Sequence, residues 1–367
     1  MSRALDGFGD RNQASTHARS RRKSHDVDAA VEFYNVIGFR VTEYTEDETS
    51  RRLWAAWTHR KDGGHDIAFA SGPPAPASSC TRVPHPIAII DLLDRLLKRA
   101  GPGMFPFERI VCLTEETVET LYLLGEERRI VGVSGYAVRP PRVRREKPRV
   151  SAFISADIDK ILALQPDLVL TFSDLQADIV AALIRANVEV HAFNQRDVAG
   201  IFGMIQTLGA LVGATEKADA LAAELHVRLK DVRRRASELP QRPRVYFEEW
   251  DEPMISGIGW VSELIAAAGG IDVFAELSAR KNAKDRIVTA EQVIAAAPDI
   301  IIGSWCGKKF VPARVAARPA FAGIPAVKTG WLREVKSTVI LQPGPAALTD
   351  GLDQLASILA EWARASA

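Results

Sequence analysis

Two aromatic residues stand where an α/β protein would place a ligand. Phe172 and Trp305 each follow a short, continuous apolar run, and each run follows a helical pattern and a Pro-Asp pair. These runs predict buried strands. Ligands of open α/β sheets bind outside the carboxyl ends of the strands. The pattern therefore points to ligand binding at the strand ends.

The cysteines and the overall charge exclude several classes of protein. Cys80, Cys112 and Cys306 lie far apart and form no Cys-x-x-Cys pair, so no disulfide framework is expected. Forty-seven Lys and Arg against 46 Asp and Glu give a net charge of +1 over 367 residues. This balance argues against a nucleic-acid partner. No apolar run of about 18 residues is present, so no membrane insertion is expected.

Basic residues gather in one Pro-containing loop over 139–149. Two interpretations are open. The guanidinium groups could contact an anionic rim of a ligand, such as a phosphate or a carboxylate, or the loop could simply be solvated. The loop contains Arg139, Arg142, Arg144, Arg145, Lys147 and Arg149.

The elements that would position Phe172 and Trp305 occur twice. Segments 156–172 and 289–305 share an amphipathic helix, a Pro-Asp break, a buried strand and a terminal aromatic residue. The copies lie about 130 residues apart, too far for a solenoid repeat, which indicates two similar lobes. The longest helical pattern, 215–239, lies between them. We predict an α/β fold with two Rossmann-like lobes, parallel sheets and one long connecting helix, with a ligand held between the lobes.

Residues from about 107 to 367 resemble the cluster-type (class III) substrate-binding proteins of bacterial ABC importers. These proteins bind cobalamin, haem or ferric siderophores, and the vitamin B12-binding branch is the most similar. The resemblance rests on ERIVCLTEETVETLYLLG, RIVGVSGYAVRPP, MISGIGWVSELIAAAGGIDVF and the two repeated units. It implies a non-enzymatic protein that needs no cofactor, holds a corrinoid or a ferric chelate, and docks on an ABC permease dimer.

The resemblance also implies site residues. Aromatic faces suit a large, flat, apolar ligand with polar rims. The matching aromatic positions are Tyr136, Phe153, Phe172, Trp250, Trp260 and Trp305, with Arg139 and Arg142 at the ligand rim. His191, at a strand end, is either an axial ligand to a metal centre or a packed histidine. Permease docking would use Asp159, where the family has glutamate, and Glu263 as the second acidic residue.

Residues 30–70 resemble part of a second family, the extradiol dioxygenases of the vicinal oxygen chelate class. His65 matches the acid-base histidine of these enzymes, but Ser79 stands where they have a metal-binding histidine. The repeat that carries the glutamate ligand is missing. A facial triad that lacks its ligands does not hold the metal. We therefore expect no dioxygenase activity and no metal site.

These readings divide the chain into six segments. We expect a disordered basic tail (1–26), a partial βαβββ-like fragment (27–72), a Pro-rich linker with an amphipathic helix (73–104), an N-terminal lobe (105–214), a bridging helix (215–240) and a C-terminal lobe (241–367).

The expected location conflicts with the resemblance. Residues 1–26 contain no apolar segment typical of a secretory signal peptide, so the chain as written would act in the cytoplasm, whereas the family is periplasmic. Two alternative functions stay open. One is a cytosolic corrinoid-binding or salvage protein that uses the same cleft, and the other is a metal-dependent extradiol dioxygenase.

Overall fold

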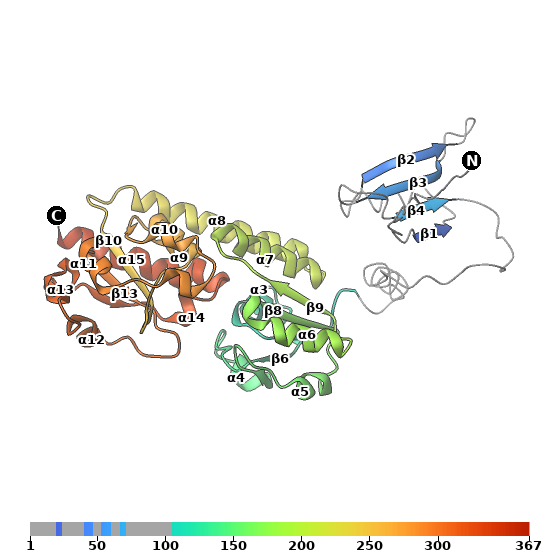
Figure 1. Ribbon diagram of the computed structural model, residues 1–367, viewed down its shortest axis with the longest axis horizontal. Coiled ribbons are helices and arrows are strands. Elements are labelled where there is room, and N and C mark those ends of the chain that lie inside the picture. Colours follow the sequence, from blue (N-terminus) through green and yellow to red (C-terminus); the bar gives the residue numbers. More distant parts are fainter. Residues whose placement is uncertain (1–19, 24–39, 47–52, 60–66, 71–104, 367) are drawn as a thin grey trace, which may run out of the picture. The chain divides into compact units, whose positions relative to one another are not determined.

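The structure is a computed structural model that describes residues 20–23, 40–46, 53–59, 67–70 and 105–366 (Figure 1). The chain divides into two compact units, Met1–Arg99 and Ala100–Ala367. The side chains described below all lie in the second unit.

The first unit contains a four-stranded sheet with the order β1-β4-β3-β2. Its strands are β1 (Ser20–Lys23), β2 (Arg40–Glu46), β3 (Leu53–His59) and β4 (Ile67–Ala70). The last three match the three consecutive strands of the predicted βαβββ-like fragment (27–72). Strand β1 does not, because the sequence predicted a disordered tail there. It pairs in parallel with the edge of β4, and such a long-range pairing leaves no periodic pattern in four polar residues. The helix predicted at the start of segment 27–72, His65 and the linker 73–104 lie outside the described residues.

The N-terminal lobe is a parallel sheet with helices on both faces, and its strand order is β7-β6-β5-β8-β9. Its central strands β5 and β8 are fully buried, as continuous apolar runs predict. The strands are β5 (Ile110–Cys112), β6 (Ile130–Ser134), β7 (Arg149–Ser151), β8 (Leu168–Phe172) and β9 (Val190–Phe193). The helices are α3 (Glu115–Leu123), α4 (Val143–Glu146), α5 (Ile158–Ala163), α6 (Ala177–Arg185) and α7 (Val198–Leu211), with 3₁₀ turns at Glu127–Arg129 and Asp174–Gln176.

The C-terminal lobe has a mixed sheet of order β11-β10-β13-β14, with β12 also paired to β10. Only β11 runs antiparallel to its neighbour. The strands are β10 (Arg244–Asp251), β11 (Met254–Ser256), β12 (Ile271–Asp272), β13 (Ile300–Gly303) and β14 (Leu332–Glu334). The helices are α9 (Gly259–Ala267), α10 (Ala275–Ser278), α11 (Ala290–Ala296), α12 (Pro312–Ala316), α13 (Pro325–Lys328), α14 (Ser337–Ile340) and α15 (Leu352–Ala365), with 3₁₀ turns at Ala283–Arg286 and Phe321–Gly323 and a π-helical turn at Ala347–Gly351.

The repeated Pro-Asp pair does the same structural work in both lobes. Asp167 accepts hydrogen bonds from the backbone N–H groups of Glu108 and Arg109, directly before β5. Asp299 accepts one from the N–H group of Arg244, at the start of β10. The guanidinium groups of Arg109 and Arg244 in turn donate to carbonyl oxygens at the ends of α5 and α11. We call each pairing, Arg109 with Asp167 and Arg244 with Asp299, an Arg–Asp clasp.

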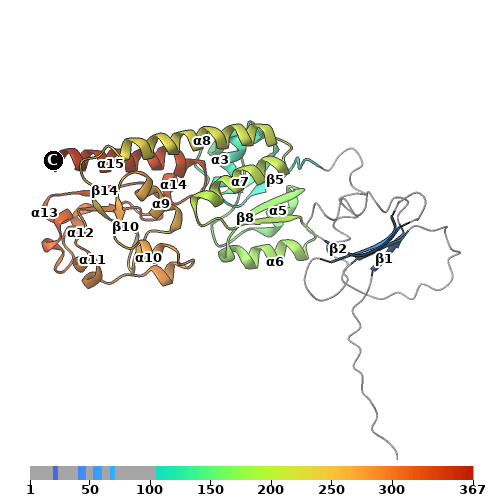
Figure 2. The ribbon, with the colours of Figure 1, turned by 90° about the horizontal axis from the view of Figure 1, so that it is seen from above.

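Helix α8 (Thr215–Ala236) joins the lobes and runs along both of them (Figure 2). Its 22 residues correspond to a length of about 33 Å. The buried face repeats at helical spacing and consists of Ala218, Ala222, Leu225, Leu229 and Val232. A Cβ atom on Gly209 of α7 would lie 2.3 Å from the Cβ of Ala218. The two helices can therefore cross this closely only because position 209 has no side chain.

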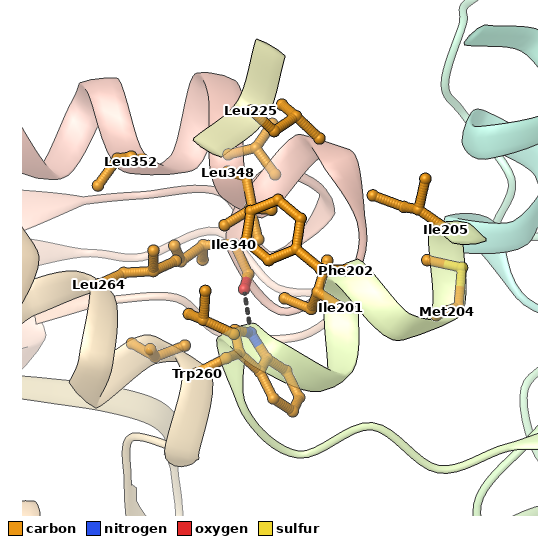
Figure 3. Packing of buried hydrophobic residues seen from close by; sticks show 14 of the residues in the cluster. Ile201, Phe202, Met204, Ile205, Leu225, Trp260, Leu264, Ile340, Leu348 and Leu352 are labelled. Carbon is orange, nitrogen blue, oxygen red and sulfur yellow. Dashed lines mark hydrogen bonds between the residues drawn. The ribbon is translucent and has the colours of Figure 1, made fainter. Parts of the chain in front are cut away.

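One continuous hydrophobic core extends through both lobes. It contains residues of β5 and β8 together with residues of α8, β10 and α15. Figure 3 shows part of it, where Phe202 of α7 lies near Leu225 of α8 and Leu348 of the C-terminal lobe. The prediction of two α/β lobes joined by one long helix is confirmed.

Candidate inter-lobe binding site

Charged side chains of the two lobes meet where strands of both sheets end. Arg196 follows β9, and the charges that act on it come from Asp174 in its own lobe and from Arg286 and Glu249 in the other lobe. Cys306 follows β13, and the charges that act on its thiol belong to Glu115 and Glu249. These mutual effects place the ends of β5, β9, β10 and β13 around one region. We call it the inter-lobe site, formed by Glu115, Phe172, Arg196, Glu249, Arg286 and Cys306.

Two buried carboxyl groups open the first turn of α3, directly after β5. Burial raises the pKa of Glu115, while burial and the nearby charge of Glu115 raise the pKa of Glu116 to about 8. Glu116 accepts a hydrogen bond from the hydroxyl group of Thr114 at 2.7 Å. The Oε2 atom of Glu115 is buried and has no hydrogen-bond partner in the described part of the chain. It is therefore a free acceptor at the inter-lobe site.

Arginine side chains supply the positive charge of the site. Arg286 is 1% exposed and binds Glu249 through two hydrogen bonds of 2.6 and 3.2 Å. The guanidinium group of Arg196 lies over the ring of Phe172, 5.1 Å from the ring centre. The Nε atoms of Arg196 and Arg286 are buried without a partner among the described residues. Both N–H groups are therefore unused donors within the described residues.

A buried carboxylate, Glu248, holds the C-terminal-lobe side chains that lie next to the inter-lobe site. Glu248 is fully buried, and its two oxygens accept hydrogen bonds from Trp305, Tyr246 and Arg318. Its charge is balanced by Arg318, whose Nη1 lies 2.5 Å from Oε2. A carboxylate this fully bonded holds its partners firmly. This hydrogen bond therefore fixes the orientation of the Trp305 indole, directly before Cys306 in the chain.

The loop after Trp305 is held at both ends. Phe310 folds back over Gly303, where a Cβ atom would lie 1.9 Å from the phenyl ring, and packs edge-on against Trp305 at 5.0 Å between ring centres. Lys308 binds the Asp251 carboxylate at 2.6 Å and lies over the ring of Trp250. The loop therefore presents its exposed residues from a fixed base.

The predicted aromatic contacts divide into two groups. Tyr136 is 53% exposed. Phe153 and Trp250 are half-buried, with Phe153 packed against the core and one face of Trp250 covered by Lys308. Phe172 is buried but borders the inter-lobe site through Arg196. Trp305 is 3% exposed, and its indole serves the buried network of Glu248 instead of an open surface.

Trp260 lies in the core. It is 3% exposed and donates its indole N–H to the carbonyl oxygen of Ile340 at 2.8 Å, among Leu264 and residues of α7 (Figure 3). The prediction of a ligand contact is wrong for this residue, because α9 turns this face of the helix inward. The sequence shows an aromatic residue near a turn, but helix amphipathicity places it in the core.

Two arginines of the basic loop form ion pairs within the protein. Arg139 pairs with Glu119 and Asp350, at 2.8 and 2.9 Å. Arg142 pairs with Glu127 and also lies over the ring of Tyr122. Acidic side chains of the protein thus pair with both arginines, and their contact with the rim of a ligand stays a prediction.

The other residues predicted to bind a metal or dock on a permease lie apart from one another in the structure. His191 is partly buried, burial lowers the pKa of its imidazole, and it packs edge-on against Phe193 at 4.4 Å between ring centres. Asp159 is exposed on the first turn of α5. Glu263 instead accepts a hydrogen bond from the backbone N–H of Val198 at 3.0 Å, so it joins the lobes internally. His65 lies outside the described residues.

A groove of about 490 Å³ runs beside the inter-lobe site. Arg196 and Asp197 of the N-terminal lobe line one side of it, and residues of α9 and α10 line the other. Within the described ranges, no group of three or more His, Cys, Asp or Glu side chains is placed to hold a metal ion. None of the helices described there combines the length and apolar character needed to cross a membrane.

Sequence reasoning missed several members of the site. Glu115 and Cys306 could have been found, because each comes within a few residues of a predicted strand end. Arg286 gave no such signal, since it belongs to a 3₁₀ turn that reaches Glu249 only through the tertiary fold.

The family model for periplasmic binding proteins matches residues 110–361. The chain belongs to this family. The matched range covers both lobes, α8 and every residue of the inter-lobe site.

Curated relatives and solved structures agree with this assignment. A cobalamin-binding protein of Halobacterium salinarum is 25% identical over 247 residues, which cover 65% of this chain and 66% of that protein. A vitamin B12-binding protein of Vibrio cholerae is 29% identical over 205 residues, covering 54% of this chain and 71% of that protein. The chain thus matches just under two thirds of the length of the Halobacterium relative.

Two solved structures share the fold. The periplasmic vitamin B12 binding protein BtuF of Vibrio cholerae has a TM-score of 0.58 and 24% identity, covering 71% of this chain and 98% of that chain. The periplasmic heme-binding protein RhuT from Roseiflexus in its apo form has a TM-score of 0.62 and 23% identity, covering 70% and 99%. These two proteins of the same fold are thus a vitamin B12 binding protein and a heme-binding protein.

Proposed function

We propose that this chain is the substrate-binding protein of an ABC importer and that it holds a corrinoid between its two lobes. The observation that carries the proposal is the inter-lobe site: an unpartnered carboxylate oxygen and unpartnered guanidinium N–H groups at the strand ends of a periplasmic binding protein fold. The curated relatives named above bind cobalamin or vitamin B12.

The charge at the site favours a corrin over a haem. The rim of a corrin carries amide groups, which offer both N–H donors and carbonyl acceptors, whereas the rim of haem carries carboxylates. The free oxygen of Glu115 suits an amide N–H and would repel a haem propionate. The buried guanidinium group of Arg286 already pairs with Glu249, so little uncompensated positive charge is left to attract carboxylates.

The open aromatic faces complete the proposed contact. Tyr136, Phe153 and Trp250 are the predicted aromatic residues that keep exposed or partly exposed rings. A flat ring system stacked on such faces buries apolar area at a small cost in rotamer freedom. We expect them to cover the ligand's faces while Glu115 and Arg196 orient its rim.

Isothermal titration with cyanocobalamin, haemin and a ferric siderophore tests the proposed function. We expect saturable binding of cyanocobalamin and weaker binding of the other two. Glu115→Gln is the matched variant, because it keeps the size of the side chain and removes its charge. This variant should bind cyanocobalamin and haemin with more similar affinities than the wild type does. Binding of haemin alone, or of no ligand at micromolar concentration, would contradict the proposal.

Docking on a permease belongs to the same proposal and needs one exposed acidic residue on each lobe. The two repeated units place Glu291 at the position of Asp159, each seven residues before the proline of its Pro-Asp pair. Both are exposed in the first turn of their helices, α5 and α11. Glu291 therefore replaces Glu263, which is bonded to Val198, as the second docking candidate.

We expect Asp159→Lys and Glu291→Lys to reduce ligand uptake into vesicles that contain the permease, without changing affinity for cyanocobalamin. Charge reversal at an exposed residue alters association far more than stability. Glu361→Lys, an exposed reversal on α15, serves as the control. Unchanged uptake in both docking variants would favour the alternative of a corrinoid-salvage protein that works without a permease.

A further inference from the structure

The groove beside the inter-lobe site is formed where the two lobes touch. A Cβ atom on Gly259, the first residue of α9, would lie 2.3 Å from the carbonyl oxygen of Arg196 and 3.6 Å from that of Ser278. The loop after β9, the start of α9 and the end of α10 therefore meet at one point. Small side chains leave the volume of about 490 Å³ next to this point open, and they are Ala266, Ala275 and Ala279.

The acidic residues that line the groove are already bonded to the backbone. Asp197 accepts a hydrogen bond from the N–H group of Gly200 at 2.6 Å, and Glu263 accepts one from the N–H group of Val198 at 3.0 Å. Both N–H groups belong to the first turn of α7, where the helix dipole favours negative charge. The two carboxylates are thus partly balanced within the protein.

The basic residues that line the groove have no comparable partners. The side chains of Arg280 and Lys281 are exposed and bond to no other side chain in the described part of the protein. Arg196 has a buried Nε atom without a partner there, and its Nη2 atom lies 3.6 Å from Oδ1 of Asp174. The groove therefore offers unused cationic donors, which suit an anionic group.

Arg196 belongs to both the groove and the inter-lobe site. It lines the groove, while its guanidinium group lies over the ring of Phe172, 5.1 Å from the ring centre. A ligand held against Phe172 therefore needs only to extend past Arg196 to enter the groove.

We propose that the groove holds the nucleotide arm of the bound corrinoid, with the phosphodiester of that arm bound by Arg196, Arg280 and Lys281. The inference rests on the proposed function and names the part of the ligand that leaves the inter-lobe site. The phosphodiester is the anionic group of this arm, whereas the other side chains of the corrin end in amides. Guanidinium and ammonium groups form charge-assisted hydrogen bonds with phosphate oxygens. Binding is noncovalent, so no bond forms or breaks.

The test compares two corrinoids on the full chain by isothermal titration. Cyanocobinamide keeps the corrin and its amides but lacks the nucleotide arm. We expect the wild type to bind cyanocobalamin at least about tenfold more tightly than cyanocobinamide, since hydrogen bonds to charged groups are the stronger ones. The double variant Arg280→Gln with Lys281→Gln should weaken cyanocobalamin about tenfold and leave cyanocobinamide unchanged.

A second double variant controls for net charge. Lys284→Gln with Arg314→Gln removes the same charge from exposed residues that do not line the groove, and it should behave as the wild type. Cyanocobinamide also reports on folding, because a variant that still binds it has kept its inter-lobe site.

The two corrinoids separate failure of this inference from failure of the proposed function. Loss of the preference for cyanocobalamin in the groove variant alone supports the inference. Equal affinity of the wild type for both corrinoids, a preference that persists in the groove variant, or equal weakening of both corrinoids overturns it, while the proposed function stands. If the wild type binds neither corrinoid, the proposed function itself fails.

Discussion

Individual aromatic residues in this chain have opposite roles despite similar places in the sequence. Trp260 fills the core, while Tyr136 is exposed on the N-terminal lobe. Trp260→Ala should lower the free energy of unfolding by about 3–5 kcal/mol, because it leaves a large cavity and an unpaired carbonyl group on Ile340. Tyr136→Ala should leave that free energy nearly unchanged. Chemical denaturation of both variants measures the contrast, and equal losses would contradict it.

Buried carboxyl groups on α3 make stability depend on pH. The pKa of Glu116 is raised from 4.5 to about 8 in the folded protein, so between these values the folded state holds a proton that the unfolded state has released. Stability therefore falls as the pH rises through this window. Glu116→Gln should remove this part of the dependence, with a gain over wild type at pH 8 and none below pH 4.5.

Thermal unfolding of Glu116→Gln and wild type across this range checks the prediction. The control is Glu119→Gln, on the same helix, whose carboxylate is bonded to Arg139 and to the N–H of Ala346. A constant difference between Glu116→Gln and wild type at all pH values would show that the pKa of Glu116 is the same in the folded and unfolded states.

At the scale of elements, the Arg–Asp clasps tie each helix–strand unit to its neighbouring strand. Asp167→Ala and Asp299→Ala should each destabilise the protein by about 1–3 kcal/mol, since each leaves backbone N–H groups without an acceptor. Asp299→Asn keeps one acceptor and should be nearly neutral. Asp167→Asn should be intermediate, because Asp167 serves two N–H groups. Urea denaturation measures all four, and a costly Asp299→Asn would contradict this account.

The same elements show how far sequence reasoning extends. Helix α8 begins at Thr215 as predicted and ends at Ala236, and the two repeated units fold alike, because hydrophobic periodicity and Pro-Asp breaks act locally. The site was only partly predictable. Phe172 and Cys306 follow strands, but the ion pairs of Arg139 and the inward turn of Trp260 depend on residues far away in the chain.

At the scale of the whole molecule, the hydrophobic core shared by both lobes predicts that the second unit unfolds in a single cooperative step. The N-terminal strand β5 and the C-terminal strand β13 belong to the same hydrophobic cluster. We expect hydrogen exchange to give the same opening free energy for the amides of Cys112 and Ile302, and denaturant to shift both equally. Distinct opening free energies for the two strands would show that the lobes unfold separately.

The crossing of α7 and α8 lies outside the residues that form the inter-lobe site. Gly209 and Ala218 let α7 and α8 cross without intervening side chains, and α7 also packs against α9 of the other lobe. A methyl group added at position 209 would push α7 and α8 apart. Because α8 runs along both lobes, this displacement would extend to the strand ends. Variants of this crossing offer a way to refit the cleft to thicker or thinner ligands while every contact residue stays the same.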